Sequence, residues 1–400
     1  MSGESCRVKA NIHELKQSEQ QWRQWRRFLH QHPELSYQEK ETTAFVRRML
    51  TEWGIPSRSG EHGHGIIADI AGSRPGPTVA LRADMDALPI QDQKTCDYRS
   101  RQAGVMHACG HDGHTSVLLG LAKFFAENRQ ELNGNVRLIF QHAEEFTPGG
   151  AVAMIRAGAL EGVDVVYGIH LWTPLQVGHI ASAPGPFMAA ADEFTIDVRG
   201  KGGHAGLPHE AVDSIYIGSQ LVQSLQGIVS RQINPVQPAV VSVCSFQGGS
   251  SFNIIADQCQ LKGTVRTFDE QTRHQIHNRI RQLTEHVTTM HGGMGELHYQ
   301  DGYPSVVNHA REFERFERIG VEQMGSERVQ RMPYVMAGED FAYYLQKVPG
   351  CFMFVGAGNP DKGMVYPHHH PLFDIDEDAL LIAGELLVSM TLDYMQTHTE

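Results

Sequence analysis

The chain has 400 residues, of which 41% are hydrophobic and 20% charged, a balance typical of globular proteins. Its length predicts two domains, and its formal net charge of −12 argues against nonspecific binding to nucleic acid. No apolar stretch approaches the roughly 18 residues of a membrane span, and the N-terminal segment lacks the apolar core of a secretory signal. We therefore expect a soluble cytoplasmic protein.

Helices and an α/β layer are expected in the first half of the chain. Helical spacing of large apolar residues predicts helices over residues 11–31 and 37–53, the first ending before Pro33 and the second at Gly54. Alternating strands and helices follow, which predicts an α/β class with a mostly parallel sheet. The expected strands are residues 65–71, 78–84, 136–142 and 163–170, with helices at 115–128 and 149–157.

From about residue 192 the pattern changes to β-α-β-β-α-β, the order of a ferredoxin-like domain. The expected elements are residues 193–199, 211–228, 239–246, 259–267, 270–291 and 296–301. The α/β pattern then resumes, with strands at 334–335 and 352–356 and a closing helix from Glu377. We therefore expect a small α+β domain, residues 187–302, inserted into a discontinuous larger domain, residues 1–186 and 303–400, with Pro184-Gly185-Pro186 as the hinge.

The 23 histidines are the unusual feature of the composition, whereas the six cysteines have no disulfide framework spacing and are expected as free thiols. The densest group of potential ligands is MHACGHDGH, residues 106–114. It places His107, Cys109, His111, Asp112 and His114 directly before a predicted helix. Cys and His are ligands of zinc and related divalent ions. A His-rich loop that caps the helix, with the cysteine simply buried, is the alternative interpretation.

Three further segments supply metal-ligand residue types. QHAEE ends a strand with the paired carboxylates Glu144 and Glu145, His170 ends another strand, and the run His368–His370 precedes the last helix. Taken one at a time, exposed glutamates, a hydrogen-bonded histidine and a solvated turn would each explain them. Together, four segments can converge at one edge of a sheet with ligands for two metals and a free carboxylate, which is the equipment for metal-assisted hydrolysis.

These motifs lie within a resemblance to a known family. The runs HPELSYQE, ALRADMDALP, MHACGHDGHTS, QHAEE, GGHAGLPHEAVDSI, GTVRTF, AGEDFAYY and HHP resemble peptidase family M20, the aminoacylase/dipeptidase metallopeptidases. The closest resemblance is to its amidohydrolase subgroup, which contains N-acyl-amino-acid, hippurate and auxin-conjugate hydrolases. It covers roughly residues 25–390. Asp84 departs from the wider family, where most members have a ligand histidine, and the cluster Cys109-Gly110-His111 compensates, as in the subgroup.

The resemblance implies a zinc-aminopeptidase-like catalytic domain that binds two divalent ions, with Mn, Zn, Co or Ni all suited to mixed N, O and S ligands. Cys109 would bridge the two metals, and Glu144 would act as general base and then as acid. The remaining ligands would be His111, Glu145, His170 and His369, with His368 and His370 as alternatives to His369. The residues expected to support these ligands without binding metal are Asp86, Glu339 and Asp340.

The inserted domain has candidates of its own, in GGHAG and on its strands. The resemblance implies that His204 reaches across a homodimer, or within a tetramer, to stabilise the oxyanion in the partner's site. It also implies that Asn253 and Arg266 hold the carboxylate end of the substrate, and a guanidinium suits a carboxylate bidentately. Without the resemblance, His204 would be a turn residue and Arg266 a solvated charge. This domain would serve for dimerisation and as a lid that closes over the site.

We therefore expect a metal-dependent amidohydrolase that splits N-acyl-L-amino acids into a carboxylic acid and a free amino acid. A dipeptidase or carboxypeptidase, or an N-acetyl-diaminopimelate deacetylase, could use the same metal site. A non-catalytic metal-binding dimer is the alternative from a different class. The intact Glu144 argues against it, because metal binding alone does not need a carboxylate beside the ligands.

Overall fold

The computed structural model describes residues 3–398, and the side chains of residues 15–61 and 63–398. The chain forms two compact units. Unit 1 comprises Met1–Gly185, Val307–Pro333 and Asp340–Glu400, and unit 2 comprises Pro186–Val306 and Tyr334–Glu339. In the described part of the chain, no helix is long and apolar enough to span a bilayer.

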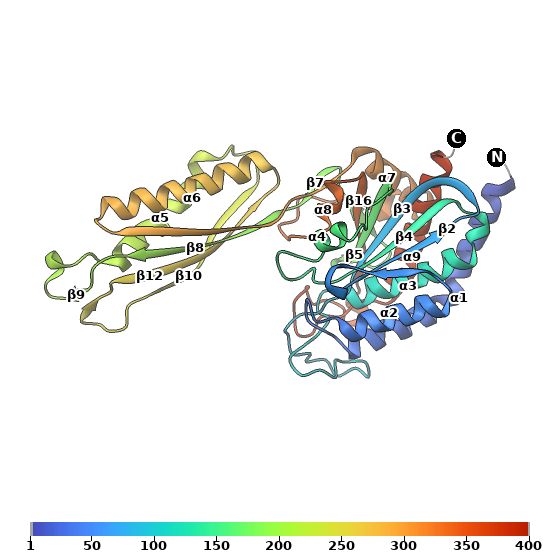
Figure 1. Ribbon diagram of the computed structural model, residues 1–400, viewed down its shortest axis with the longest axis horizontal. Helices are drawn as coiled ribbons and strands as arrows, with labels where there is room; N and C mark the ends of the chain where they lie inside the picture. The colour runs from blue at the N-terminus through green and yellow to red at the C-terminus, as the bar shows by residue number, and fades with distance from the viewer. Residues whose placement is uncertain (1–2, 399–400) are drawn as a thin grey trace. The chain divides into compact units, whose positions relative to one another are not determined.

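Unit 1 is built around an eight-stranded sheet with the order β1-β2-β4-β3-β5-β16-β6-β15 (Figure 1). The four central strands β4, β3, β5 and β16 are parallel, whereas β1 and β2 join antiparallel at one edge. The expected α/β class with a mostly parallel sheet is confirmed. The strands are β1 (Ser57–Ser59), β2 (Ile66–Ala71), β3 (Arg74–Asp84), β4 (Asn133–Gln141), β5 (Val165–Gln176), β6 (Ile180–Ser182), β15 (Val329–Arg331) and β16 (Gly350–Gly358).

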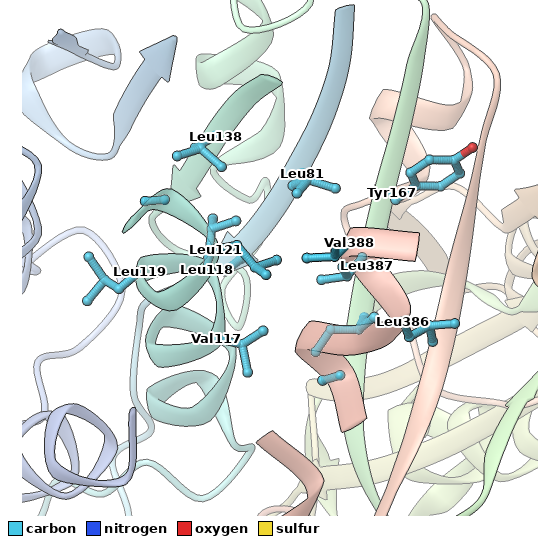
Figure 2. Packing of buried hydrophobic residues seen from close by; sticks show 14 of the residues in the cluster. Leu81, Val117, Leu118, Leu119, Leu121, Leu138, Tyr167, Leu386, Leu387 and Val388 are labelled. Carbon is cyan, nitrogen blue, oxygen red and sulfur yellow. The ribbon is translucent and has the colours of Figure 1, made fainter. Parts of the chain in front are cut away.

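Helices of unit 1 cover this sheet. The main ones are α1 (Gly3–Gln31), α2 (Lys40–Glu52), α3 (His111–Glu127), α4 (Ala151–Arg156), α7 (Ala310–Met324), α8 (Ala342–Leu345) and α9 (Asp378–Thr397). Helices α1, α3 and α9 pack on one another, and α3 and α9 also pack on β3. Figure 2 shows the resulting core, in which Leu118 of α3 lies near Leu81 of β3 and Val388 of α9. This packing covers the apolar carboxyl-terminal parts of β3 and β4.

Several helix and strand boundaries differ from the prediction. Helix α2 begins at Lys40 rather than at residue 37, because Tyr37 has a left-handed φ of 63°. Helix α3 begins at His111, four residues earlier than predicted, directly after Gly110 with φ 93°. The strand predicted at 334–335 is wrong, since Val335 forms only an isolated bridge and the strand lies earlier, in β15. Helix α7, with Phe316 buried, was not predicted.

Unit 2 has a four-stranded antiparallel sheet with the order β10-β12-β8-β13. The chain order β8-α5-β10-β12-α6-β13 matches the ferredoxin-like order predicted from sequence. Helices α5 and α6 pack on this sheet (Figure 1). A two-stranded ribbon of β9 and β11 extends from it. The elements are β8 (Ala190–Arg199), β9 (Gly203–His204), α5 (Ser214–Gln232), β10 (Ala239–Gly248), β11 (Ile254–Ile255), β12 (Gln258–Thr267), α6 (Glu270–Met290) and β13 (Met294–Tyr303).

The chain first passes from unit 1 to unit 2 in β7 (Gly185–Met188) and returns in β14 (Val306–Asn308), and these two short strands pair with each other. It enters unit 2 a second time for Tyr334–Glu339.

Candidate metal centre

The candidate ligands lie where the sheet of unit 1 changes its winding direction. Strand β3 lies between β4 and β5 in the sheet. The chain runs from β3 through α3 to β4 on one side of β3, and then through α4 to β5 on the other side. The carboxyl ends of parallel strands form a crevice at such a point. Asp84 is the last residue of β3 and Asp86 follows it, Glu144 and Glu145 follow β4, and His170 lies on β5.

Cys109 belongs to two groups of potential ligands. In the first, donor atoms of Cys109, His111 and His170 lie within 4.8 Å of one another, and in the second Cys109 is joined in the same way by Glu145 and His369. The Cys109 Sγ is 3.5 Å from His170 Nε2, and Glu145 Oε1 is 3.2 Å from His369 Nε2. The structure therefore brings all five predicted ligands together, with the thiol common to both groups.

The donor atoms at this place fit a divalent ion. His111 Nε2 is buried and makes no hydrogen bond, although buried polar atoms ordinarily have partners. Glu145 Oε1 is buried beside it, with the His369 ring at 3.2 Å. His111 Nδ1 lies 2.9 Å from the Asp86 carbonyl oxygen and 3.2 Å from its Oδ1, which places the ring proton on Nδ1. Nε2 is then directed into the group of ligands, where it can bind an ion once its proton has left. Imidazole nitrogen and carboxylate oxygen are both common zinc-type ligands.

The charges of the site favour a cation. Burial alone would lower the pKa of His111, but Asp84, Asp86 and Glu145 outweigh burial and raise this pKa to about 10. Burial raises the pKa of the Cys109 thiol well above its usual range, and the neighbouring carboxylates add to the effect. Because a metal binds the thiolate, metal uptake at this site would release a proton.

The three adjacent histidines differ in their surroundings. His369 faces Glu145, as stated above. His368 is the nearest competitor, because its Nδ1 is 3.9 Å from Cys109 Sγ, while its Nε2 accepts a backbone N–H at 3.4 Å. His370 accepts a backbone N–H two residues further along the chain through its Nδ1. This geometry favours His369 as the ligand over His370.

Left-handed backbone surrounds the same site. Tyr37, Ala143 and His369 have φ values of 63°, 51° and 65°, and they are the non-glycine residues with positive φ in the described part of the chain. Side chains rarely adopt this conformation, and its strain concentrates at functional sites. Ala143 directly precedes Glu144, and its N–H donates to Glu39 Oε1 at 2.8 Å. The turn that carries the paired glutamates is thus held in a costly conformation by a buried partner.

Asp86, one of the residues expected to support the ligands, contacts two of them. Its carbonyl oxygen and Oδ1 face His111, and its Oδ2 accepts the backbone N–H of Glu145 at 2.9 Å. Ser36 donates its hydroxyl to the same Oδ2 at 2.7 Å. One buried carboxylate therefore orients a ligand ring and fixes the backbone of a second ligand.

Asp340 lies one layer further from the ligands. It accepts hydrogen bonds from Gln141 Nε2 at 2.7 Å, from Arg82 at 2.7 Å and from the N–H of Ala151 at 3.0 Å. It therefore fixes the end of β4 rather than a ligand. Glu339, which precedes it, is also buried.

A buried ion-pair network, which the sequence did not predict, holds the start of α3. The Arg26 side chain is fully buried, with Nε 2.8 Å from Asp112 Oδ2 and a terminal nitrogen 2.6 Å from Asp374 Oδ1. A second terminal nitrogen is 3.5 Å from Glu377 Oε1. His30 Nδ1 lies 2.7 Å from Asp112 Oδ2. Asp112 follows the candidate ligand His111 directly, so this network fixes the helix turn that presents the ligand.

In unit 2, His204 and Asn253 lie together and Arg266 lies apart from them. His204 and Asn253 line a cavity of about 1040 Å³, and the N–H of Ala205 donates to the Asn253 carbonyl at 3.1 Å. His204 Nδ1 accepts the N–H of Gly206 at 3.0 Å, so the proton of the neutral ring is on Nε2. Arg266 stands near the opposite end of β12 from this cavity and donates to the Met336 carbonyl at 3.3 Å.

Burial raises the pKa of Glu39 to about 8, and Asp86 adds to the rise. Since its ordinary pKa is 4.5, the folded chain keeps a proton here that the unfolded chain loses between about pH 4.5 and 8. The free energy of unfolding therefore falls as pH rises through this window. We expect Glu39→Gln, which keeps an acceptor for Ala143, to gain stability relative to the parent by at least ~1.4 kcal/mol between pH 5 and pH 9.

The measurement is urea unfolding of chelator-treated parent and variant across this pH range. Glu41→Gln, an exposed substitution on the same helix, is the matched control and should give a constant difference from the parent. A Glu39→Gln curve parallel to that of the parent would contradict the expectation.

Comparison with known proteins identifies relatives that are hydrolases and metal-binding peptidases. Residues 80–393 match peptidase family M20/M25/M40. An N-acyl-L-amino acid amidohydrolase from Geobacillus stearothermophilus is 47% identical over 71% of this chain and 77% of its own. Thermostable carboxypeptidase 1 from Saccharolobus solfataricus is 41% identical over 90% and 92%. A crystal structure of the Bacillus subtilis protein YXEP, described as a dinuclear metal binding peptidase, superposes with a TM-score of 0.83 at 36% identity, covering 96% and 99%.

Proposed function

The chain belongs to peptidase family M20/M25/M40 and is a hydrolase of amide bonds, and from this premise we propose that it hydrolyses N-acyl-L-amino acids to a carboxylic acid and a free amino acid. The observation that carries the proposal is the pair of ligand groups sharing Cys109, with Glu144 beside them. A carboxylate oxygen of Glu144 lies within 4.8 Å of both His111 and Glu145.

Two divalent ions held by Cys109, His111, Glu145, His170 and His369 would supply an activated water and polarise the substrate carbonyl. Glu144 is 6% exposed, so its carboxylate is largely sheltered from bulk water. In the proposed reaction it takes a proton from the attacking water and passes it to the leaving amine nitrogen as the C–N bond breaks.

Unit 2 would complete the site in a homodimer. His204 has the tautomer needed to donate from Nε2 to a developing oxyanion, which is the largest stabilising effect in many acyl transfers. Asn253 and Arg266 are separated by most of β12, six residues or more at ~3.4 Å each. One small carboxylate cannot contact both within one copy of unit 2, so the proposal draws them from two chains.

Metal-dependent release of amino acids tests this function. Enzyme stripped with chelator and reloaded with Mn, Zn, Co or Ni should release amino acids from N-acetyl, N-benzoyl or indole-acetyl substrates. Cys109→Ala should lose both ions and all measurable activity, because both groups share its thiol. Cys351→Ala, at a buried cysteine on β16, is the matched control and should keep metal content and activity.

A carboxypeptidase or dipeptidase is the second candidate, favoured by the similarity to the Saccharolobus carboxypeptidase. Cleavage of dipeptides with no release from acyl amino acids would establish that reading instead. A reloaded enzyme that binds two ions and cleaves no member of either panel would support the non-catalytic alternative.

A further inference from the structure

His114 is one of two histidines of the MHACGHDGH cluster, with His107, to which the proposed reaction gives no role. It is buried, with 2% of its surface exposed, on the first turn of α3. Its ring centre is 5.4 Å from that of His111 and 4.7 Å from that of His170. A histidine this close to two ligands either binds metal itself or serves the ligands.

Its hydrogen bonds decide between these roles. The backbone N–H of Leu171 donates to His114 Nε2 at 2.9 Å, and His114 Nδ1 lies 2.6 Å from Asp84 Oδ1. Because Nε2 is an acceptor, the neutral ring carries its proton on Nδ1 and donates it to the carboxylate. Both ring nitrogens are therefore engaged, and neither offers a lone pair to an ion.

The second carboxylate oxygen of Asp84 is also hydrogen-bonded. Its Oδ2 accepts from a terminal nitrogen of Arg82 at 2.6 Å, and Arg82 Nε donates to Gln141 Oε1 at 2.9 Å. Arg82 is 2% exposed and Asp84 is fully buried. This chain of bonds ties His114 to the ends of β3 and β4.

The bond to Leu171 reaches a ligand directly. Pairing of β5 with β3 ends at Gly168. Three residues further along β5, the backbone N–H of Leu171 donates to the His114 ring instead of to a strand. His170 Nδ1 donates to the carbonyl of Leu171 at 3.0 Å, which turns His170 Nε2 toward Cys109. The Leu171 residue is thus held at its N–H by His114 and contacts His170 through its carbonyl.

We propose that His114 is a positioning residue, which fixes Leu171 and so aims His170 Nε2 at the metal beside Cys109 without binding the metal itself. This inference rests on the proposed metal centre. Partners of metal ligands typically contribute 10- to 100-fold to metal affinity. The expected effect is therefore confined to the ion that His170 binds.

Three variants and their combinations test the proposal by calorimetric titration of metal-free enzyme. His114→Asn removes the acceptor for Leu171 and should weaken one of the two ions about 10- to 100-fold. His114→Gln, whose longer amide can still accept this N–H, should restore most of the affinity. His170→Ala should weaken the same ion, and adding His114→Asn to it should cause little further loss, because both act through one ligand.

Nitrogen NMR of histidine-labelled enzyme supplies a readout that a merely structural role would not give. His114 should keep its proton on Nδ1 before and after metal loading. A metal-shifted His114 Nε2 signal would make it a ligand and overturn the proposal, as would additive losses in the double variant. If His170→Ala leaves both affinities unchanged, His170 is not a ligand and the proposed ligand set is wrong. A normal affinity in His114→Asn with a loss in His170→Ala refutes this inference alone.

Discussion

Glutamine in place of Glu144 should lower kcat by about 10²- to 10⁴-fold, the usual contribution of a positioned general base. Glutamine has nearly the same shape but cannot accept the proton of the attacking water. Since the proposed ligands are other residues, the variant should still bind two ions per chain. Rate measurements over a range of substrate concentrations, together with elemental analysis of the same samples, check both parts of this expectation.

Metal content separates the two roles open to Glu144. Its carboxylate also forms a group of potential ligands with His111 and Glu145. A Glu144→Gln enzyme that loses an ion along with its activity would show a ligand rather than a base. An enzyme that keeps both ions and more than a tenth of kcat would show that neither role is needed. Glu127→Gln, at the exposed end of α3, is the control.

Arg26→Met should destabilise the protein by about 3–5 kcal/mol, the effect of removing one partner from a buried ion-pair network. Methionine fills much of the space but leaves Asp112, Asp374 and Glu377 without the guanidinium that links them. Because globular domains are stable by only about 5–15 kcal/mol, this is a large part of the total. Guanidinium unfolding of the metal-loaded enzyme measures the change.

The neighbouring arginine supplies the matched control. Arg27 also pairs with Glu377, at 2.6 Å, but its side chain is 47% exposed. Exposed ion pairs contribute about 0–1 kcal/mol, so Arg27→Met should change stability by no more than this. Equal losses in the two variants would mean that burial of Arg26 has no energetic consequence and would contradict the expectation.

Much of the metal centre was predictable from sequence because its ligands come in short local runs. The apolar strands before Glu144 and His170 placed these side chains at one sheet edge, and the structure brings them together with Cys109. Local patterns were also sufficient for the ferredoxin-like order of unit 2.

Other residues that support the ligands could not be found from local patterns. Ser36 and Arg82 are ordinary residues in their own segments. Ser36 bonds Asp86, 50 residues away, and Arg82 bonds Asp340, 258 residues away in the chain. The start of α3 was misplaced because its first turn is polar and buried at once, with His111 and Asp112 bonded to other segments. The role of such residues is set by contacts with distant segments, which a local sequence pattern does not contain.

The path of the chain also bears on how the protein folds during synthesis. Apart from one short segment, unit 2 is continuous, from Pro186 to Val306, so its sheet and both helices can form soon after they leave the ribosome. Unit 1 can complete its fold only after the C-terminal part of the chain is made, because β16 inserts between β5 and β6 and α9 completes the core. These late contacts have high contact order, which slows folding. Until they form, the apolar strands β4 and β5 lack their final cover, and this incomplete sheet is the stage most exposed to aggregation.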